Sequence, residues 1–169
     1  MRHLFLGLCL FTAACSGQNF SPTSPSGTGG ALTQAKGGAN VEVTFTKWVT
    51  TFPTLSGITA GDAAGTFAGA VLSRDPFDNG TIVQLEARYA VTANNPAHSF
   101  VAEIKGSQNN QTHQAVLNGT VISGWLAGAQ VQATYDVIVP QAGTSCVPQA
   151  PVNRTCFQGT IRIMPGSAN

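Results

Sequence analysis

The clearest structural signal in the chain is residues 81–92, which read TIVQLEARYAVT. Apolar and polar side chains alternate along this segment. One face carries Val83, Leu85, Ala87, Tyr89 and Val91, and the other carries Gln84, Glu86 and Arg88. An alternation with a period of two residues indicates a β-strand with one buried face. We therefore expect a strand here whose apolar face lies on the core.

Residues 99–105 follow a turn at residues 94–96 and alternate in the same way. An antiparallel hairpin that places Arg88 opposite Glu103 satisfies both faces at once. The same register pairs Glu86 with Lys105, Val91 with Phe100, Tyr89 with Ala102, and Ala87 with Ile104. A slip of one residue would set an apolar face against a polar one. The two glutamates are thus predicted to fix the register, not to act in catalysis.

The rest of the chain shows the same kind of pattern in shorter runs. Further strands are expected at residues 41–46, 64–73, 112–122, 125–139 and 157–164. Breaks are expected at Pro53, Gly57 and Gly61, in the turn-rich residues 74–80, and in the polar residues 107–111. Short strands separated by turn signals indicate an antiparallel all-β domain. We expect residues 41–165 to form a single meander barrel or β-sandwich of about seven or eight strands.

Cys146 and Cys156 close a short loop that contains Pro148 and Pro151. No further metal-ligand type of residue sits nearby, which argues against a metal site. A disulfide is predicted in place of two free buried thiols, because the export signal described next implies a compartment where disulfides persist. The loop-entropy model assigns such a bridge a stabilisation of about 2–3 kcal/mol.

The first residues of the chain have the pattern of an export signal. Arg2 precedes a short apolar run, residues 4–11, and small residues follow. The run is shorter than the ~20 apolar residues that a membrane span requires. The motif Thr12-Ala13-Ala14-Cys15 resembles the lipobox of bacterial lipoproteins. The alternative is an ordinary secretory signal with an unrelated cysteine.

The lipoprotein resemblance implies a specific maturation. Residues 1–14 would be the signal peptide, and Cys15 would become the acylated first residue. Residues 15–40 would then be a lipidated cysteine and a tether rich in Ser, Gly and Pro, too poor in apolar residues to fold. In that family, Ser16 after the cysteine implies export to the outer membrane. The expected location is the bacterial cell envelope, with the lipid anchor as membrane partner.

Charge composition excludes one class of partner. The chain has a formal net charge of +1, and removal of residues 1–14 takes away Arg2, which leaves a mature chain with no net charge. A nucleic-acid-binding domain would carry a basic excess. We expect no nucleic-acid partner.

No catalytic motif stands out. His98 and His113 lack Cys, Asp or Glu at metal-ligand spacing, and no Gly-X-Ser-X-Gly elbow or dinucleotide fingerprint occurs. We therefore expect no catalytic residue, metal or cofactor. Candidate ligand-lining residues are the aromatics Trp48, Tyr89, Trp125 and Tyr135, which would serve equally well as core.

Three functions remain open from the sequence. The first is a lipid-anchored envelope β module with a non-catalytic binding or structural role. The second is a small barrel that carries an apolar ligand. The third is an enzyme with a site inside the barrel. A packed interior would favour the non-catalytic module, and an apolar cavity with one or two polar groups would favour the carrier. A cavity in which acids or histidines with perturbed pKa values converge would favour the enzyme.

Overall fold

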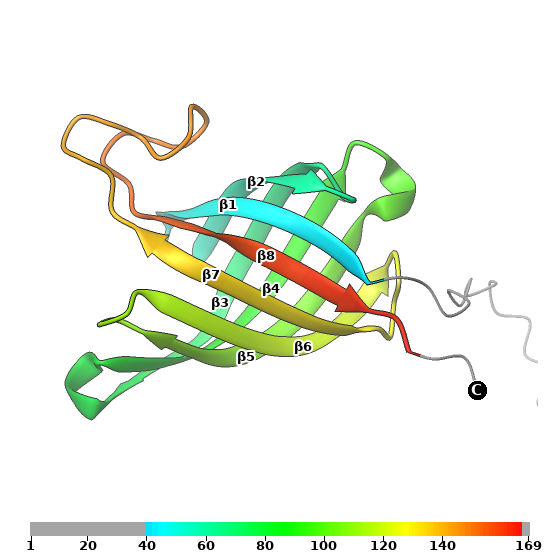
Figure 1. Ribbon diagram of the computed structural model, residues 1–169, viewed down its shortest axis with the longest axis horizontal. Coiled ribbons are helices and arrows are strands. Elements are labelled where there is room, and N and C mark those ends of the chain that lie inside the picture. The colour runs from blue at the N-terminus through cyan, green and yellow to red at the C-terminus, as the bar shows by residue number, and fades with distance from the viewer. Residues whose placement is uncertain (1–39, 167–169) are drawn as a thin grey trace, which may run out of the picture. The chain divides into compact units, whose positions relative to one another are not determined.

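A computed structural model describes residues 40–166, which form one closed antiparallel barrel (Figure 1). Its strands are β1 (Val41–Thr51), β2 (Thr54–Gly61), β3 (Gly65–Phe77), β4 (Ile82–Ala93), β5 (Phe100–Asn109), β6 (Gln114–Gly124), β7 (Gln130–Ile138) and β8 (Cys156–Met164). Each strand pairs with the next in the sequence, and β8 closes the sheet on β1. The predicted all-β meander barrel is confirmed, and the sandwich alternative is not what the chain adopts. Closure leaves no unpaired sheet edge.

The predicted signal peptide, Cys15 and nearly all of the predicted tether lie outside the described residues. Two short 3-10 turns, Asp78–Gly80 and Pro96–His98, interrupt the strands. Within residues 40–166, no helix has the length and apolar character needed to cross a membrane.

The predicted register of the β4–β5 hairpin is confirmed. Arg88 lies opposite Glu103, and Glu86 lies opposite Lys105. Arg88 Nη2 is 2.6 Å from Glu103 Oε1, and both side chains are exposed on the outer face. The apolar partners line the inner face, as the alternation requires. Both glutamates thus point away from the interior.

The strand boundaries differ from expectation in several places, and β1 continues past the expected residues 41–46 to Thr51. Residues 54–61, predicted as a break, form β2, because Gly57 pairs within the ladder opposite Lys47. β3 continues through the turn-rich residues to Phe77. β5 continues through the first part of the predicted polar break to Asn109, because residues 106–109 pair with both β4 and β6. β7 begins only at Gln130, because residues 125–129 make a turn with backbone bonds such as Trp125 N to Ser99 O, 2.8 Å.

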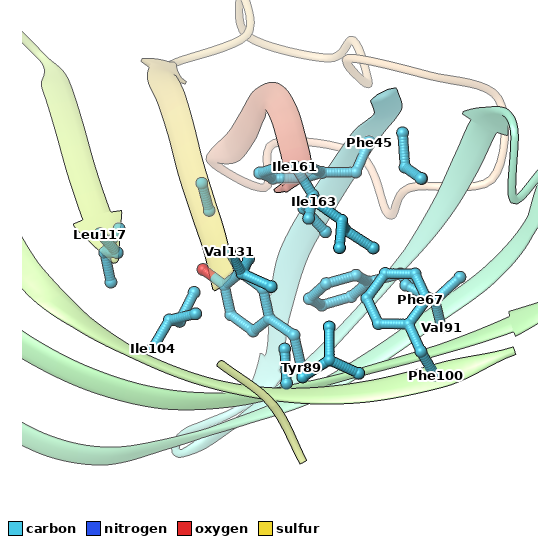
Figure 2. Close-up of a cluster of buried hydrophobic side chains, with 14 of the residues drawn as sticks. Phe45, Phe67, Tyr89, Val91, Phe100, Ile104, Leu117, Val131, Ile161 and Ile163 are labelled. Carbon is cyan, nitrogen blue, oxygen red and sulfur yellow. The ribbon is translucent and has the colours of Figure 1, made fainter. Parts of the chain in front are cut away.

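Inward side chains from every strand form the core of the barrel. The largest fully buried ones are Tyr89, Phe100, Ile104, Leu117, Ile161 and Ile163. Figure 2 shows Phe67, Tyr89 and Phe100 converging in this interior. Phe67 and Tyr89 meet edge to face, with ring centroids 4.9 Å apart. Burial of such large apolar surfaces is the main force that holds the barrel together.

The two ends of the barrel differ. At one end the loops after β2, β4 and β6 lie beside Asn40 and Gly166, the first and last described residues (right in Figure 1). There Trp125 stacks on His98 with ring centroids 4.1 Å apart, which covers the end. The opposite end carries the hairpin turns after β1, β3 and β5 and the long connection 139–155 (left in Figure 1). We call these the closed end and the open end.

The predicted disulfide between Cys146 and Cys156 is confirmed, with a Cα–Cα distance of 6.4 Å. It pins the connection 139–155 to the start of β8. Trp48 packs with Cys156 and Ala150 in a small cluster separate from the main core. The bridge therefore holds this loop over the outer face of β1.

Candidate functional site

A cavity of about 210 Å³ lies inside the barrel at the open end. Most of its wall is apolar. Its lining side chains are Val49, Phe52, Leu55, Val71, Val83, Leu85, Ala87, Leu117 and Phe157, with the polar Lys47, Arg74, Tyr89, Gln108 and Tyr135. Mostly apolar walls with a few placed polar groups are typical of small-molecule sites.

Lys47 is the most unusual residue of this cavity. It extends inward from β1, between the inward positions Phe45 and Val49, and is only 3% exposed. Its ammonium nitrogen donates a hydrogen bond to the hydroxyl of Tyr89. Within residues 40–166, neither of the two ion pairs involves Lys47. A buried ammonium group that lacks a carboxylate partner is costly to the fold.

Aromatic rings surround the Lys47 ammonium group. Its nitrogen lies 4.1 Å from the ring centroid of Tyr89 and 4.3 Å from that of Tyr135. The rings of Phe45, Phe157 and Phe67 follow at 5.3, 5.6 and 5.9 Å. Ring faces attract a cation through their quadrupoles and replace part of the lost hydration. Burial nevertheless lowers the pKa of Lys47 well below its ordinary value.

The two tyrosines remain protonated donors. Burial raises the pKa of Tyr89, with a smaller contribution from the nearby Tyr135. Burial likewise raises the pKa of Tyr135. The Tyr135 hydroxyl donates to Gln108 Oε1 at 3.0 Å. Since Tyr89 accepts from Lys47, its own proton stays available for a second acceptor.

Glycines opposite these long side chains make room for them. Gly57 lies opposite Lys47, Gly69 opposite Tyr89, and Gly159 opposite Tyr135. A Cβ at Gly57 would lie 2.8 Å from Lys47 Cα, and one at Gly159 would lie 2.6 Å from Tyr135 Cα. Any larger residue at Gly57 or Gly159 would clash with the backbone of the neighbouring strand, so the close approach beside Lys47 and Tyr135 requires glycine.

Arg74 reaches the mouth of the cavity because of a bulge. The β3–β4 register shifts between Val71 and Ser73, after which Arg74 pairs with the inward-facing Leu85. A bulge adds one residue to a strand and so changes which side the following residues face. Arg74 remains exposed and contributes a second cation to the cavity wall.

The four predicted lining aromatics separate into three places. Tyr89 and Tyr135 line the cavity. Trp48 lies outside the barrel beneath the disulfide loop, and Trp125 caps the closed end against His98. Sequence reasoning missed Lys47 and Arg74. The signal for Lys47 was present, because it continues the inward alternation of Val43 and Phe45.

A larger depression of about 420 Å³ lies on the outer face, between β8, β1 and β2. It is more open to solvent, and its lining, which includes Thr44, Ile58 and Thr160, contains no charged side chain. It encloses a ligand less well than the interior cavity does. In the described part of the chain, no three His, Cys, Asp or Glu side chains gather where they would hold a metal ion.

Comparisons with protein-family models, with curated proteins and with solved structures found no match to this chain. The cavity and its lining are therefore the observations that bear on function.

Proposed function

We propose that the protein is a lipid-anchored module of the bacterial cell envelope that binds a small, mainly apolar ligand inside its barrel. The observation that carries this proposal is the cavity at the open end, with an apolar wall and a few polar groups around Lys47. A barrel of this size built for stability alone would fill the space with side chains.

The volume of the cavity limits the ligand. About 210 Å³ is below the roughly 300–1,000 Å³ of sites for drug-sized molecules. A dry apolar cavity of about 150 Å³ is enough for benzene. The ligand that fits is of similar or slightly greater size, with any longer part extending out of the mouth.

The role is proposed to be non-catalytic binding. Glu86 and Glu103 lie on the outer face, so they are not placed to serve as an interior acid and base. The membrane location rests on the motif at residues 12–15. β1 begins at Val41 at the closed end, so an anchor at Cys15 would join the domain at the end away from the cavity mouth.

A cavity-filling substitution tests the binding function. Ala87 lines the cavity, whereas Ala90 on the same strand faces outward. Calorimetry with the neutral probe 1-hexanol should show binding to the wild type and to Ala90→Leu, and at least about tenfold weaker binding to Ala87→Leu, because the added side chain fills the cavity. Equal binding to all three proteins, or failure of the wild type to bind both 1-hexanol and the corresponding acid, hexanoate, would overturn the proposal.

The anchor is tested separately. The full chain expressed in a bacterium should partition into detergent and carry a diacylglycerol mass on Cys15, whereas Cys15→Ser should not. Soluble export of the native chain, cleaved elsewhere, would refute the anchor and leave the binding function standing.

A further inference from the structure

We propose that the ligand carries a carboxylate, which accepts hydrogen bonds from the Lys47 ammonium group and the Tyr89 hydroxyl while its apolar part fills the cavity. This inference rests on the proposed binding function and specifies the chemistry of the ligand.

The charge of the cavity favours an anion. The titratable groups that face it are Lys47 from β1, Arg74 from β3, Tyr89 from β4 and Tyr135 from β7. Among the described residues that line it, none is Asp or Glu. Two groups are basic and two are neutral phenols at neutral pH, so the wall has no negative charge. A cationic ligand would meet repulsion, and an anionic ligand would meet an unpaired ammonium group.

Lys47 has no carboxylate partner among residues 40–166, and this is itself informative. A buried charge carries a desolvation penalty that an apolar side chain of similar shape avoids. A methionine would fit the same space with no desolvation penalty. A residue that breaks the rules of a stable core with only partial compensation from its neighbours points to a functional site. A bound carboxylate supplies the missing compensation.

The hydrogen-bonding groups match a carboxylate. Lys47 Nζ and Tyr89 Oη are in direct contact, and each retains a proton that the other does not use. The two oxygens of a carboxylate accept one from each group. An alcohol has a single oxygen and no charge, so it gains only the weaker, neutral kind of hydrogen bond.

Arg74 supports entry of the ligand. Its guanidinium group is exposed at the mouth, while Lys47 lies buried deeper in the same cavity. Basic groups along an entrance raise the local concentration of an anion. An exposed cation at the mouth and a buried one deeper inside thus attract a carboxylate from solvent into the cavity.

Three probes of equal length separate the charge from the apolar part: hexanoate, 1-hexanol and hexylamine. A tail of about six carbons suits the cavity volume. Calorimetry on the full chain should give hexanoate at least about tenfold tighter binding than 1-hexanol, since a charge-assisted hydrogen bond replaces a neutral one. Hexylamine should bind more weakly than either. Equal affinities for the acid and the alcohol would overturn the carboxylate proposal while keeping the binding function, and failure of both to bind would overturn the two together.

Matched lysine variants assign the effect to one residue. Lys47→Met should lose the preference for hexanoate and keep 1-hexanol binding, because it removes the charge and preserves the apolar shape. Lys105→Met removes an exposed lysine from the outer face of β5 and should behave as the wild type. Circular dichroism confirms that each variant is folded. Retention of the acid preference in Lys47→Met would refute the role of Lys47.

Proton uptake gives an independent readout. A bound carboxylate raises the pKa of Lys47, so binding of hexanoate at mildly alkaline pH should take up protons. Calorimetry in two buffers of different ionisation enthalpy measures this uptake, which Lys47→Met should lack. The competing chemistry, imine formation between the Lys47 amine and an aldehyde with loss of water, is tested with hexanal and borohydride. A trapped hexyl adduct on Lys47 without any preference for hexanoate would overturn the proposal.

Discussion

The inner and outer faces of the barrel wall use charged residues in opposite ways. Arg88 and Tyr89 are neighbours on β4, yet Arg88 faces solvent and pairs with Glu103, whereas Tyr89 faces inward and contacts Lys47. The outer ion pair loses little hydration, because both side chains stay exposed, and it favours one register of the hairpin. The inner cation is stripped of water and lacks a carboxylate partner among the described residues. The difference teaches that a charge outside serves folding specificity, while the charge inside requires a functional reason.

Apolar residues show the same contrast. Ile161 on β8 is completely buried on the inner face, whereas Ile122 on β6 is 47% exposed. The two side chains are identical and both belong to strands. Only the direction in which each one points decides how much water it excludes, and therefore how much it stabilises the barrel.

The largest expected effect comes from truncating one residue on each face. Ile161→Ala should lower the free energy of unfolding by about 2–5 kcal/mol, because it opens a cavity in a closely packed interior. Ile122→Ala should cost less than about 1 kcal/mol, the range of strand propensity at an exposed site. Denaturant titration of both variants measures the contrast. Equal losses would mean that the two faces do not differ in packing.

A smaller effect concerns the pH dependence of stability. Because burial lowers the pKa of Lys47, the unfolded chain binds a proton that the folded chain has released between that lowered pKa and about 10.4. Stability should therefore rise with pH in this window, by at most about 1.4 kcal/mol per pH unit. The wild type should show the rise, and so should Lys105→Met, whereas Lys47→Met should lack it.

This measurement has a natural upper limit. The raised pKa values of Tyr89 and Tyr135 act in the opposite direction, because the unfolded tyrosines lose their protons first above about pH 10. Unfolding titrations up to about pH 9.5 avoid that range, and the difference between the wild type and Lys47→Met isolates the lysine. A wild-type curve parallel to that of Lys47→Met would show that Lys47 titrates normally and would weaken the contrast between the faces.

The smallest expected effect is that of the outer ion pair. A double-mutant cycle with Arg88→Ala and Glu103→Ala should give a coupling free energy of about 0.2–1 kcal/mol, because the two side chains are 54% and 38% exposed. Added salt should reduce it further. A coupling free energy well above this range would show that the outer ion pair also contributes substantially to the stability of the barrel.

Much of the fold was predictable because local patterns dictated it. The alternation at residues 81–92, together with two oppositely charged pairs, left one register for the β4–β5 hairpin, and the structure has it. The disulfide was predicted from the expected export to an oxidising compartment and from the absence of nearby metal-ligand residues, and the structure has it. Strand β2 was missed because Gly57 and Gly61 weaken the local signal. Its pairing with β1 and β3 compensates for that weakness, and such pairing is not visible in a single segment.

The candidate site was much less accessible to prediction. Tyr89 was placed correctly on an inward face, because alternation alone decides it. Trp48 follows the inward Lys47 by one residue, so it faces outward beneath a loop that lies about a hundred residues further along the chain.

The sequence by itself determined the strand class and the β4–β5 register, since each depends on the spacing of nearby residues, and it was enough to predict the disulfide. Only the tertiary structure decided that β8 closes on β1, that a bulge directs Arg74 to the mouth, and that five aromatic rings gather around Lys47. The physical reason is that a barrel interior is built from every strand at once. Whether a lysine on an inward face meets water, a carboxylate or a cavity depends on side chains that no local pattern brings together.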